Sequence, residues 1–250
     1  MIITFANQKG GVGKTTSAIN IGVYLAQYKK KVCLLDLDPQ SNLTSGLGYA
    51  NQDRISIYNV LIEEKDINLC TFETRFRYLD LIPSSIELAG AEIELVNQIS
   101  RETILKNILA KIKLRYDYII IDCPPSLGLL TINALTASDE VYIPVQTEYF
   151  ALEGLGQLLN TIKLVKNKLN QKLKIGGVIL TMYDARTNLA KEVKAEVQKV
   201  FSNKVFETII PRNVKLSESP SHGLSIQEYD SNSTGAKAYK GLCEEIINKI

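Results

Sequence analysis

The chain has 250 residues, of which 45% are hydrophobic and 22% charged, as in an ordinary globular protein. Its 29 Lys and Arg side chains nearly balance 27 Asp and Glu, so a nucleic-acid surface can only be a local patch. No apolar run approaches the about 20 residues that span a bilayer. Because the first predicted strand begins at once, we expect no signal peptide.

The length suits one α/β domain or at most two small ones. No repeat, low-complexity tract or Pro/Gly/Ser-rich linker interrupts the chain, so we expect residues 1–250 to form a single domain. The four cysteines, Cys33, Cys70, Cys123 and Cys243, lack C-x-x-C spacing and lie in or beside apolar stretches. We expect them to be core residues in a reducing cytosol.

Short β-rich runs alternate with longer helical patterns. This order predicts an α/β fold with a doubly wound, mostly parallel β-sheet flanked by helices. The predicted strands are residues 2–6, 32–35, 79–83, 118–121, 140–145, 177–182 and, more weakly patterned, 206–210. The predicted helices are residues 15–28, 87–99, 102–114, 127–137, 152–169, 189–201 and 233–250. Within residues 46–77 only a short helix near 57–63 is indicated.

A glycine-rich loop joins the first predicted strand to the first predicted helix. Its residues are Lys9, Gly10, Gly11, Val12, Gly13, Lys14, Thr15 and Thr16. Glycines let backbone N–H groups curl around the phosphates of a nucleotide, and the helix N-terminus adds partial positive charge. Lys14 can bridge phosphate oxygens, and the Thr15 hydroxyl can complete a Mg²⁺ shell. A plain turn would not need two lysines, so the loop predicts a site for nucleotide phosphates and Mg²⁺.

Carboxylates follow two further predicted strands. Asp122 ends an apolar run, the position from which an Asp holds Mg²⁺, usually through water. Asp36 and Asp38 alternate after the second strand, and the polar residues 39–42 that follow are typical of a switch loop. Taken alone, this pair could also be solvated carboxylates at a turn. Ligands of open parallel sheets bind beyond the carboxyl ends of the strands, so the three segments predict one site.

The glycine-rich loop departs from the common pattern in a recognisable way. Gln8 stands where G-x-x-x-x-G-K-[ST] has its first Gly, and Lys9 precedes the glycines instead. This form resembles the deviant Walker A motif of the ParA/MinD class of P-loop ATPases. Further segments resemble the ParA/Soj family: DCPPSLG at 122–128, PVQ at 144–146, ALEG at 151–154, DARTN at 184–188, IPRNVKLSE at 210–218 and PSHG at 220–223.

The resemblance covers nearly the whole chain and is poorest at residues 49–78 and 164–174. It implies a P-loop NTPase fold and assigns roles to single residues. Asp38 would position or activate the attacking water, and Asp36 would lie in the outer coordination sphere of Mg²⁺. Lys9 would reach the nucleotide of a partner subunit, so that two subunits enclose two ATP molecules. Pro211 and Asn213 would lie beside the adenine ring, mostly through main-chain contacts.

The same resemblance implies a function. We expect a DNA-partitioning ATPase of the cytoplasm that associates with the nucleoid. ATP would close a homodimer that binds DNA non-specifically, and hydrolysis, stimulated by a ParB/Spo0J-like centromere-binding protein, would dissociate it. No stable membrane association is expected.

A local excess of positive charge offers separate support for DNA binding. Residues 163–204 contain ten Lys and Arg against three Asp and Glu. Phosphate contacts of this kind are independent of DNA sequence and sensitive to salt. The candidate DNA-binding residues are Arg186, Lys191, Lys194, Lys199 and Lys215. Charge runs also commonly solvate helix faces, and Arg186 could simply pair with Asp184.

Three other functions share parts of these motifs. A MinD-like, membrane-associated cell-division ATPase would need a free amphipathic helix at its end, whereas Tyr239, Leu242 and Ile246 indicate a face that docks on the core. An iron–sulfur reductase would need paired cysteine ligands, and Pro124 beside Cys123 differs from the glycine-flanked ligands of such enzymes. A scaffold that binds nucleotide without hydrolysis would not need Lys14, Thr15, Asp38 and Asp122 together.

Overall fold

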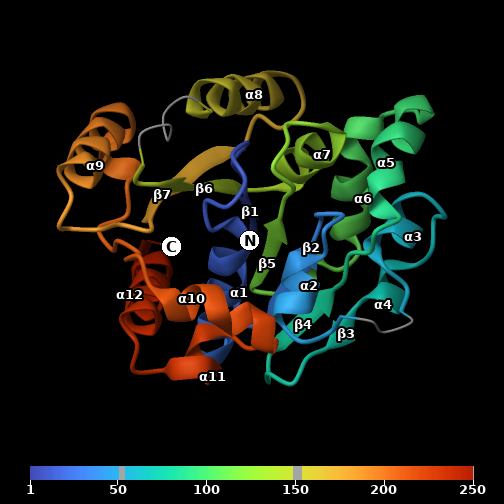
Figure 1. Cartoon of the computed structure of the whole chain (residues 1–250). Helices are drawn as coiled ribbons and strands as arrows, with labels where there is room; N and C mark the ends of the chain where they lie inside the picture. Colours follow the sequence, from blue (N-terminus) through green and yellow to red (C-terminus); the bar gives the residue numbers. More distant parts are fainter. Residues whose placement is uncertain (51–53, 149–153, 250) are drawn as a thin grey trace.

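The computed structural model describes residues 1–50, 54–148 and 154–249. A seven-stranded sheet in the order β3-β4-β2-β5-β1-β6-β7 forms its centre (Figure 1). The strands are β1 (Ile2–Phe5), β2 (Val32–Asp36), β3 (Phe72–Glu73), β4 (Leu79–Ile82), β5 (Tyr118–Asp122), β6 (Glu140–Gln146) and β7 (Lys174–Thr181). Neighbouring strands run parallel except β3, which is antiparallel to β4. The predicted fold class is confirmed.

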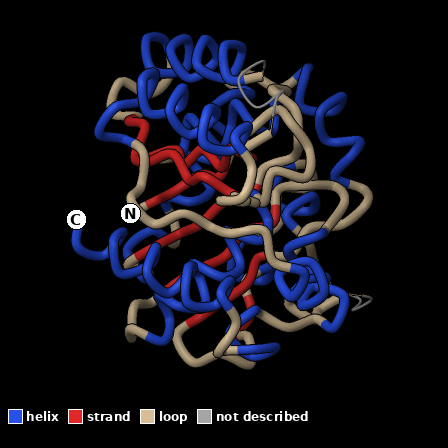
Figure 2. Tube along the Cα trace, turned by 60° about the vertical axis from the view of Figure 1, so that its left-hand side comes forward, coloured by secondary structure: helices blue, strands red, loops and turns tan. Residues whose placement is uncertain are grey.

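Helices connect the strands and cover both faces of the sheet. They are α1 (Lys14–Gln27), α2 (Asn42–Gly46), α3 (Ile57–Leu61), α4 (Ile67–Cys70), α5 (Leu88–Glu94), α6 (Ile104–Ala110), α7 (Leu129–Ala137), α8 (Leu155–Lys168), α9 (Asn188–Phe201), α10 (Val214–Glu218), α11 (Ile226–Asp230) and α12 (Thr234–Lys249). A 3₁₀ turn, η6 (Ser219–His222), separates α10 from α11. Figure 2 shows the strands (red) enclosed between helical layers (blue).

Alternating side chains of each strand enter different layers, which is why the strands read as continuous apolar runs. In β1, Ile3 and Phe5 pack with α1 and α12, whereas Ile2 packs with the layer of α5, α6 and α7. Strand β6 contributes Ile143 to a third cluster with α8 and α9. Because β1, β2 and β5 pair in parallel, their carboxyl ends lie at one edge of the sheet.

The predicted strand at residues 206–210 is wrong. This segment is flanked by two isolated bridges, Val178 with Val205 and Tyr183 with Pro211. Between them the Glu207 and Thr208 N–H groups donate to the Glu245 carboxylate of α12, at 2.9 and 3.0 Å, instead of to β7. The Phe206 and Ile210 N–H groups still donate to the Val178 and Leu180 carbonyls of β7, at 3.0 and 2.9 Å. The carboxylate from α12 therefore interrupts the ladder that would have made a continuous strand.

Several helix boundaries also differ from the predictions. The helix predicted at 87–99 divides into α5 and a 3₁₀ turn (Leu95–Asn97), and the one predicted at 102–114 is α6 between two 3₁₀ turns, Arg101–Thr103 and Lys113–Arg115. The short helix expected near 57–63 is confirmed as α3. The predicted start of the helix at 152–169, most of the ALEG segment and Ile250 lie outside the described residues.

Helix α12 is part of the core. Its residues Ala236, Tyr239, Leu242, Cys243 and Ile246 are buried, and the helix packs against α1. The predicted core-docking face of the last helix is therefore confirmed. In the part of the chain that the structure describes, no helix combines the length and apolar character needed to cross a membrane.

Candidate nucleotide-binding site

The glycine-rich loop runs from β1 into the first turn of α1. Gly13, directly before α1, has φ 87° and ψ 25°, and Gly11 has φ 70°, a left-handed conformation that side chains other than glycine rarely adopt. The Ser17 N–H donates to the Gly13 carbonyl at 2.9 Å. These two glycines turn the chain so that the free N–H groups at the start of α1 open onto the loop.

Polar side chains that the sequence analysis missed hold the loop in place. Asn7 donates from Nδ2 to the Pro144 carbonyl at 2.7 Å, and its Oδ1 accepts the Lys9 N–H at 3.0 Å. From β7, the Thr181 hydroxyl donates to the Val12 carbonyl at 2.9 Å. The signal for both was available, since each is a polar residue beside an apolar strand run that ends at this edge.

Lys14 lies inside the loop and is 6% exposed. Its Nζ donates to the Lys9 carbonyl at 3.3 Å, so the lysine spans the loop that it belongs to. Burial lowers the pKa of Lys14, while Asp122 and Asp38 oppose that effect. The Lys9 side chain is half-buried and is not among the groups that line the cavity described below.

Thr15 and Asp122 meet across the loop, as the motifs predict. The Thr15 hydroxyl donates to Asp122 Oδ2 at 2.6 Å. Asp122 is fully buried, and its Oδ1 has no hydrogen-bond partner among the described residues. Burial and, next to it, the nearby Asp36 raise the pKa of Asp122 to about 8, against the opposing effects of the Thr15 bond and of Lys14. A hydroxyl beside a buried carboxylate with an unused oxygen fits Mg²⁺, which prefers oxygen ligands and is usually held by few protein groups plus phosphates and water.

Asp36 and Asp38 have different surroundings. Asp36 is fully buried, and its Oδ2 accepts both the Thr44 N–H (2.8 Å) and the Thr44 hydroxyl (2.7 Å) from α2. Burial raises the pKa of Asp36 to about 6, and the two bonds from Thr44 oppose it. Asp38 is 6% exposed and accepts the Gln40 N–H at 2.9 Å. Asp36 thus holds the segment after β2, and Asp38 faces the cavity.

A cavity of about 510 Å³ lies over this cluster. Its lining includes Gly10, Gly11, Gly13, Lys14, Thr15, Thr16 and Asp38, together with Gln40, Asn42, Ser45, Pro125, Met182, Pro220 and Ser221. The glycine-rich loop and Asp38 therefore share one cavity with the segment after β2. Asp122 lies beneath it, in contact with Thr15.

A second cavity of about 220 Å³ adjoins the first, because Gly13, Thr16, Met182 and Pro220 line both. Pro211 and Asn213, which the family resemblance predicts beside an adenine ring, line this second cavity. The Asn213 side chain is already engaged, since Oδ1 accepts the Lys215 N–H at 2.9 Å and Nδ2 donates to Thr234 at 2.7 Å.

The candidate DNA-binding residues are not among those that line the two cavities, and three of the five lie on α9. Arg186 is 89% exposed and pairs with Asp184 through two contacts of 2.9 and 2.7 Å. Lys199 pairs with Glu196, and Lys215 on α10 pairs with Asp230. Lys194 lies 6.0 Å from the centre of the Tyr183 ring, and Lys191 is exposed.

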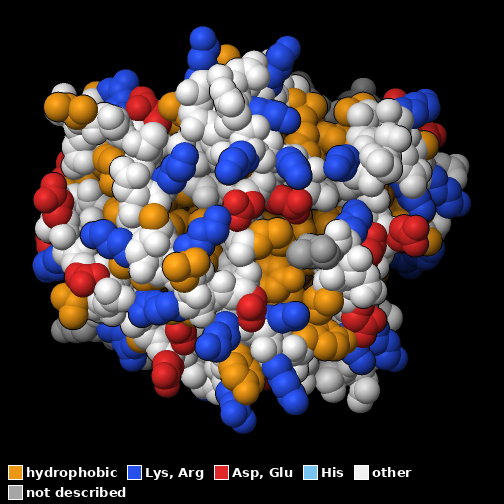
Figure 3. Space-filling view, turned by 180° about the vertical axis from the view of Figure 1, so that it is seen from behind, with side chains coloured by type: hydrophobic (Ala, Val, Ile, Leu, Met, Phe, Trp, Pro, Cys, Tyr) orange, Lys and Arg blue, Asp and Glu red, His pale blue; other side chains and the backbone are white. Residues whose placement is uncertain are grey.

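Figure 3 shows a row of Lys and Arg side chains on the face opposite that of Figure 1, with acidic side chains directly below it.

All four cysteines are unpaired thiols in the core, and Cys123 is fully buried beside Asp122.

Known proteins resemble the chain over its whole length. A family model described as an AAA domain matches residues 1–175. The sporulation initiation inhibitor protein Soj of Bacillus subtilis is 58% identical over 246 residues, which are 98% of this chain and 97% of the relative. The chromosome-partitioning ATPase Soj of Treponema pallidum is 56% identical over 98% of this chain and 96% of its own.

Solved structures agree with these relatives. A plasmid partition protein of Borrelia burgdorferi bound to AMPPNP is 31% identical with a TM-score of 0.84, and the match covers 100% of this chain and 99% of that one. Cobyrinic acid a,c-diamide synthase of Mycobacterium smegmatis with bound ADP and magnesium is 37% identical with a TM-score of 0.87, over 99% and 94%. With the loop, its partner carboxylates and these relatives in agreement, the chain belongs to the Soj/ParA family of chromosome-partitioning ATPases.

Proposed function

We propose that this protein binds and hydrolyses Mg²⁺-ATP in the two adjoining cavities and uses the cycle to partition DNA. The hydrogen bond between Thr15 and Asp122 carries the proposal, because it brings together a hydroxyl and a buried carboxylate of the kind that would hold a phosphate-bound Mg²⁺. The triphosphate would occupy the larger cavity and the adenine the smaller, beside Pro211 and Asn213.

Phosphoryl transfer needs charge neutralisation and in-line geometry more than covalent chemistry. Mg²⁺, when bound, would supply positive charge to the phosphate oxygens. Lys14 and the loop N–H groups would hold the β- and γ-phosphates. Asp38, which faces the same cavity, would position the attacking water, and Asp36 would keep the segment that carries Asp38 in place through Thr44.

The finer features of the cycle are proposals drawn from the family. Lys9 would cross to the nucleotide of a second subunit, so that ATP closes a homodimer. Its backbone is fixed by Asn7 and Lys14, whereas its side chain is not used in the cavity of its own subunit. The switch works only if ATP stabilises the dimer much more than ADP does.

The ATP-bound dimer would bind nucleoid DNA without sequence preference in the cytoplasm. Arg186 and the lysines of α9 would form the contact, and the exposure of Arg186 supports this. A ParB/Spo0J-like protein would accelerate hydrolysis and release the DNA. Intrinsic turnover would be slow, since the dimer has to outlast one encounter with DNA.

DNA retention of the purified protein with ATP, ADP or no nucleotide tests the proposal. We expect strong retention with Mg²⁺-ATP only, loss in Lys14→Ala and weakening in Arg186→Glu. Lys106→Glu makes the same charge change on an exposed residue of α6 and serves as the control. Equal retention in all three nucleotide states would contradict the proposed switch.

A further inference from the structure

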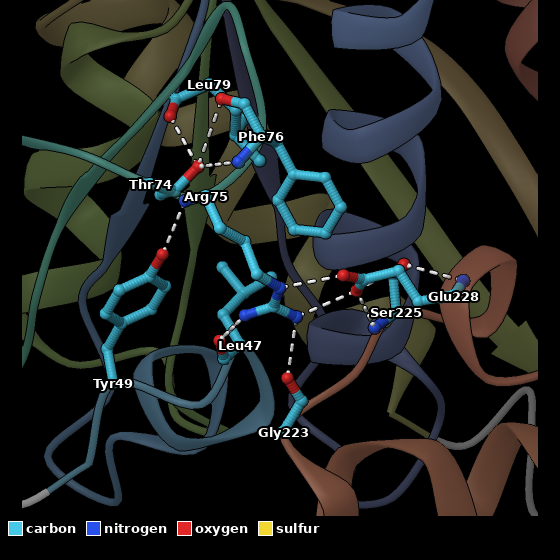
Figure 4. A network of polar contacts seen from close by, with 9 residues as sticks. All are labelled: Leu47, Tyr49, Thr74, Arg75, Phe76, Leu79, Gly223, Ser225 and Glu228. Atoms are coloured by element: carbon cyan, nitrogen blue, oxygen red, sulfur yellow. Dashed lines mark hydrogen bonds and ion pairs between the residues drawn. The ribbon is translucent and has the colours of Figure 1, made fainter.

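Arg75, in the turn between β3 and β4, joins three segments that lie far apart in the sequence (Figure 4). Its Nε and Nη2 donate to the two Glu228 carboxylate oxygens, both at 2.7 Å. Nη1 donates to the Leu47 carbonyl at 2.5 Å, and Nη2 also donates to the Gly223 carbonyl at 2.8 Å. The planar guanidinium thus serves four acceptors in one fixed fork, which a lysine ammonium cannot reproduce.

The segments that Arg75 ties together continue into two walls of the larger cavity. Asn42 and Ser45 of α2 line one wall, and Leu47 directly follows that helix. Pro220 and Ser221 of η6 line another, and Gly223 directly follows that turn. Arg75 itself is not among the lining residues, so any effect on the nucleotide must pass through the position of these walls.

Behind the cavity the segments that follow the two walls approach each other closely at two glycines. Gly48 and Gly223 have φ angles of 81° and 66°, and a Cβ added to Gly223 would lie 2.7 Å from the Gly48 Cα. A Cβ added to Gly46 would lie 3.5 Å from the Pro220 Cβ. Gly46, Gly48 and Gly223 have no side chains that could interlock at these points of approach. The directional bonds across it come from the Arg75 side chain.

The tie is anchored firmly at its Glu228 end. Glu228 also accepts the N–H and the hydroxyl of Ser225, both at 3.0 Å, at the start of α11. The Arg75 N–H donates to the Tyr49 hydroxyl at 2.6 Å. The Arg75 and Glu228 side chains are 35% and 23% exposed, so charge-assisted bonds between them are only partly screened.

We propose that Arg75 is a positioning residue that holds the α2 and η6 walls together and thereby keeps the cavity in the shape that accepts Mg²⁺-ATP. The inference rests on the proposed function. Only molecules with a closed cavity bind well, so the apparent Kd equals the intrinsic Kd divided by the closed fraction. Truncating Arg75 lowers that fraction without touching the reacting groups.

Equilibrium binding of a fluorescent ATP analogue with Mg²⁺, together with steady-state hydrolysis, tests the inference. If the closed fraction falls to about one tenth, Arg75→Ala raises Kd and KM roughly tenfold. The kcat at saturating ATP stays within about twofold of wild type, because excess ligand refills the closed state. Arg75→Lys shows much the same defect. The matched control is Arg77→Ala, in the same turn. Arg77 has no carboxylate within 4.0 Å among the described residues, so its removal leaves Kd unchanged.

Two further variants separate positioning from loss of folding. Glu228→Gln keeps the side-chain shape and the Leu47 and Gly223 bonds, and it shows a smaller rise in Kd. Gly223→Ala forces the walls apart with Arg75 intact and reproduces the Arg75→Ala defect. Unchanged Kd in folded Arg75→Ala, or a kcat loss with unchanged KM, overturns the inference alone. Absence of ATP binding to the wild-type protein overturns the proposed function, and the inference with it.

Discussion

The nucleotide site and the basic surface of α9 are organised in opposite ways. At the sheet edge, groups from β1, β2, β5 and α1 converge through short bonds such as Thr15 to Asp122 (2.6 Å), and most of them are buried. On α9 and its flanking loop the basic residues are mostly exposed, and two of them pair with carboxylates nearby in sequence, Arg186 with Asp184 and Lys199 with Glu196.

The two regions show how far each kind of sequence signal can be used to predict a site. Motifs at strand ends locate a site because the topology of the sheet forces those ends together. A count of charges along the chain does not reveal which cations are already paired. The account therefore predicts large effects for single residues of the nucleotide site and small effects for single residues of α9.

The largest effect is expected for Lys14→Ala. This lysine is buried beside the phosphate loop, and no other described lysine lines the cavity. Removing one preorganised group that stabilises transition-state charge costs roughly 100- to 1000-fold in rate, and lost nucleotide affinity adds to that. We expect kcat/KM for ATP to fall roughly 1000-fold or more, measured by phosphate release. A loss below about tenfold would remove the contrast between the two regions.

Asp38→Ala separates chemistry from binding within the same cavity. Among the described residues, the Asp38 carboxylate accepts one hydrogen bond, from the Gln40 N–H to Oδ1. Removing this side chain therefore leaves the phosphate loop intact. A group that positions or activates water contributes roughly 100- to 10,000-fold, so we expect turnover to drop by about 100-fold or more. The Kd for Mg²⁺-ATP should stay close to wild type. Equal losses in affinity and turnover would show instead that Asp38 shapes the cavity.

Both results would bear on what the sequence could predict. The strands were predictable because residues such as Ile120 and Val145 lie in runs buried on both faces, and the loop was predictable from its glycines. The short elements β3, α4, α10 and α11 were not, since two to five residues carry no clear periodicity. The bonds from Glu207 and Thr208 to Glu245 interrupt the predicted strand at 206–210. They join positions 38 and 37 residues apart, and no local pattern signals them.

The site follows the same division. Lys14, Thr15, Asp38 and Asp122 were identified from motifs. Asn7 and Thr181, which fix the loop, were missed because single polar residues at strand ends are common. The Arg75 tie depends on three distant segments and could not be read from the sequence. The single-domain boundary at 1–250 and the role of each site residue stay predictions.

A tenfold effect at most is expected on the basic surface. Arg186→Glu places a negative charge where an exposed arginine lay, and we expect DNA affinity with ATP at low salt to fall roughly three- to tenfold. The slope of log Kd against log salt should decrease by about one unit per lost phosphate contact. Lys106→Glu is the control. A 1000-fold loss would show that a single residue of this surface matters as much as a single residue of the nucleotide site.

The smallest effect concerns stability and the Arg75 tie. Burial pushes the pKa of Glu228 up, but the bonds from Arg75 and Ser225 outweigh it, so the pKa lies below its ordinary value of 4.5. The charged form therefore adds stability above about pH 4.5 that is lost as the pH falls through the lowered pKa. We expect the free energy of unfolding of Glu228→Gln to be about 1 kcal/mol lower than that of wild type at pH 7. The difference from wild type should shrink toward pH 3 in urea titrations, and a constant gap would contradict this.

Light scattering of the purified protein with Mg²⁺-ATP and with ADP measures the particle mass. It thereby tests whether the triphosphate joins two subunits through Lys9. In the Asp38→Ala background, where ATP persists, the account predicts twice the monomer mass with ATP and the monomer mass with ADP. It predicts the monomer mass in both states for Lys9→Ala. The same mass in wild type with either nucleotide, or an unaltered ATP dimer in Lys9→Ala, would contradict it.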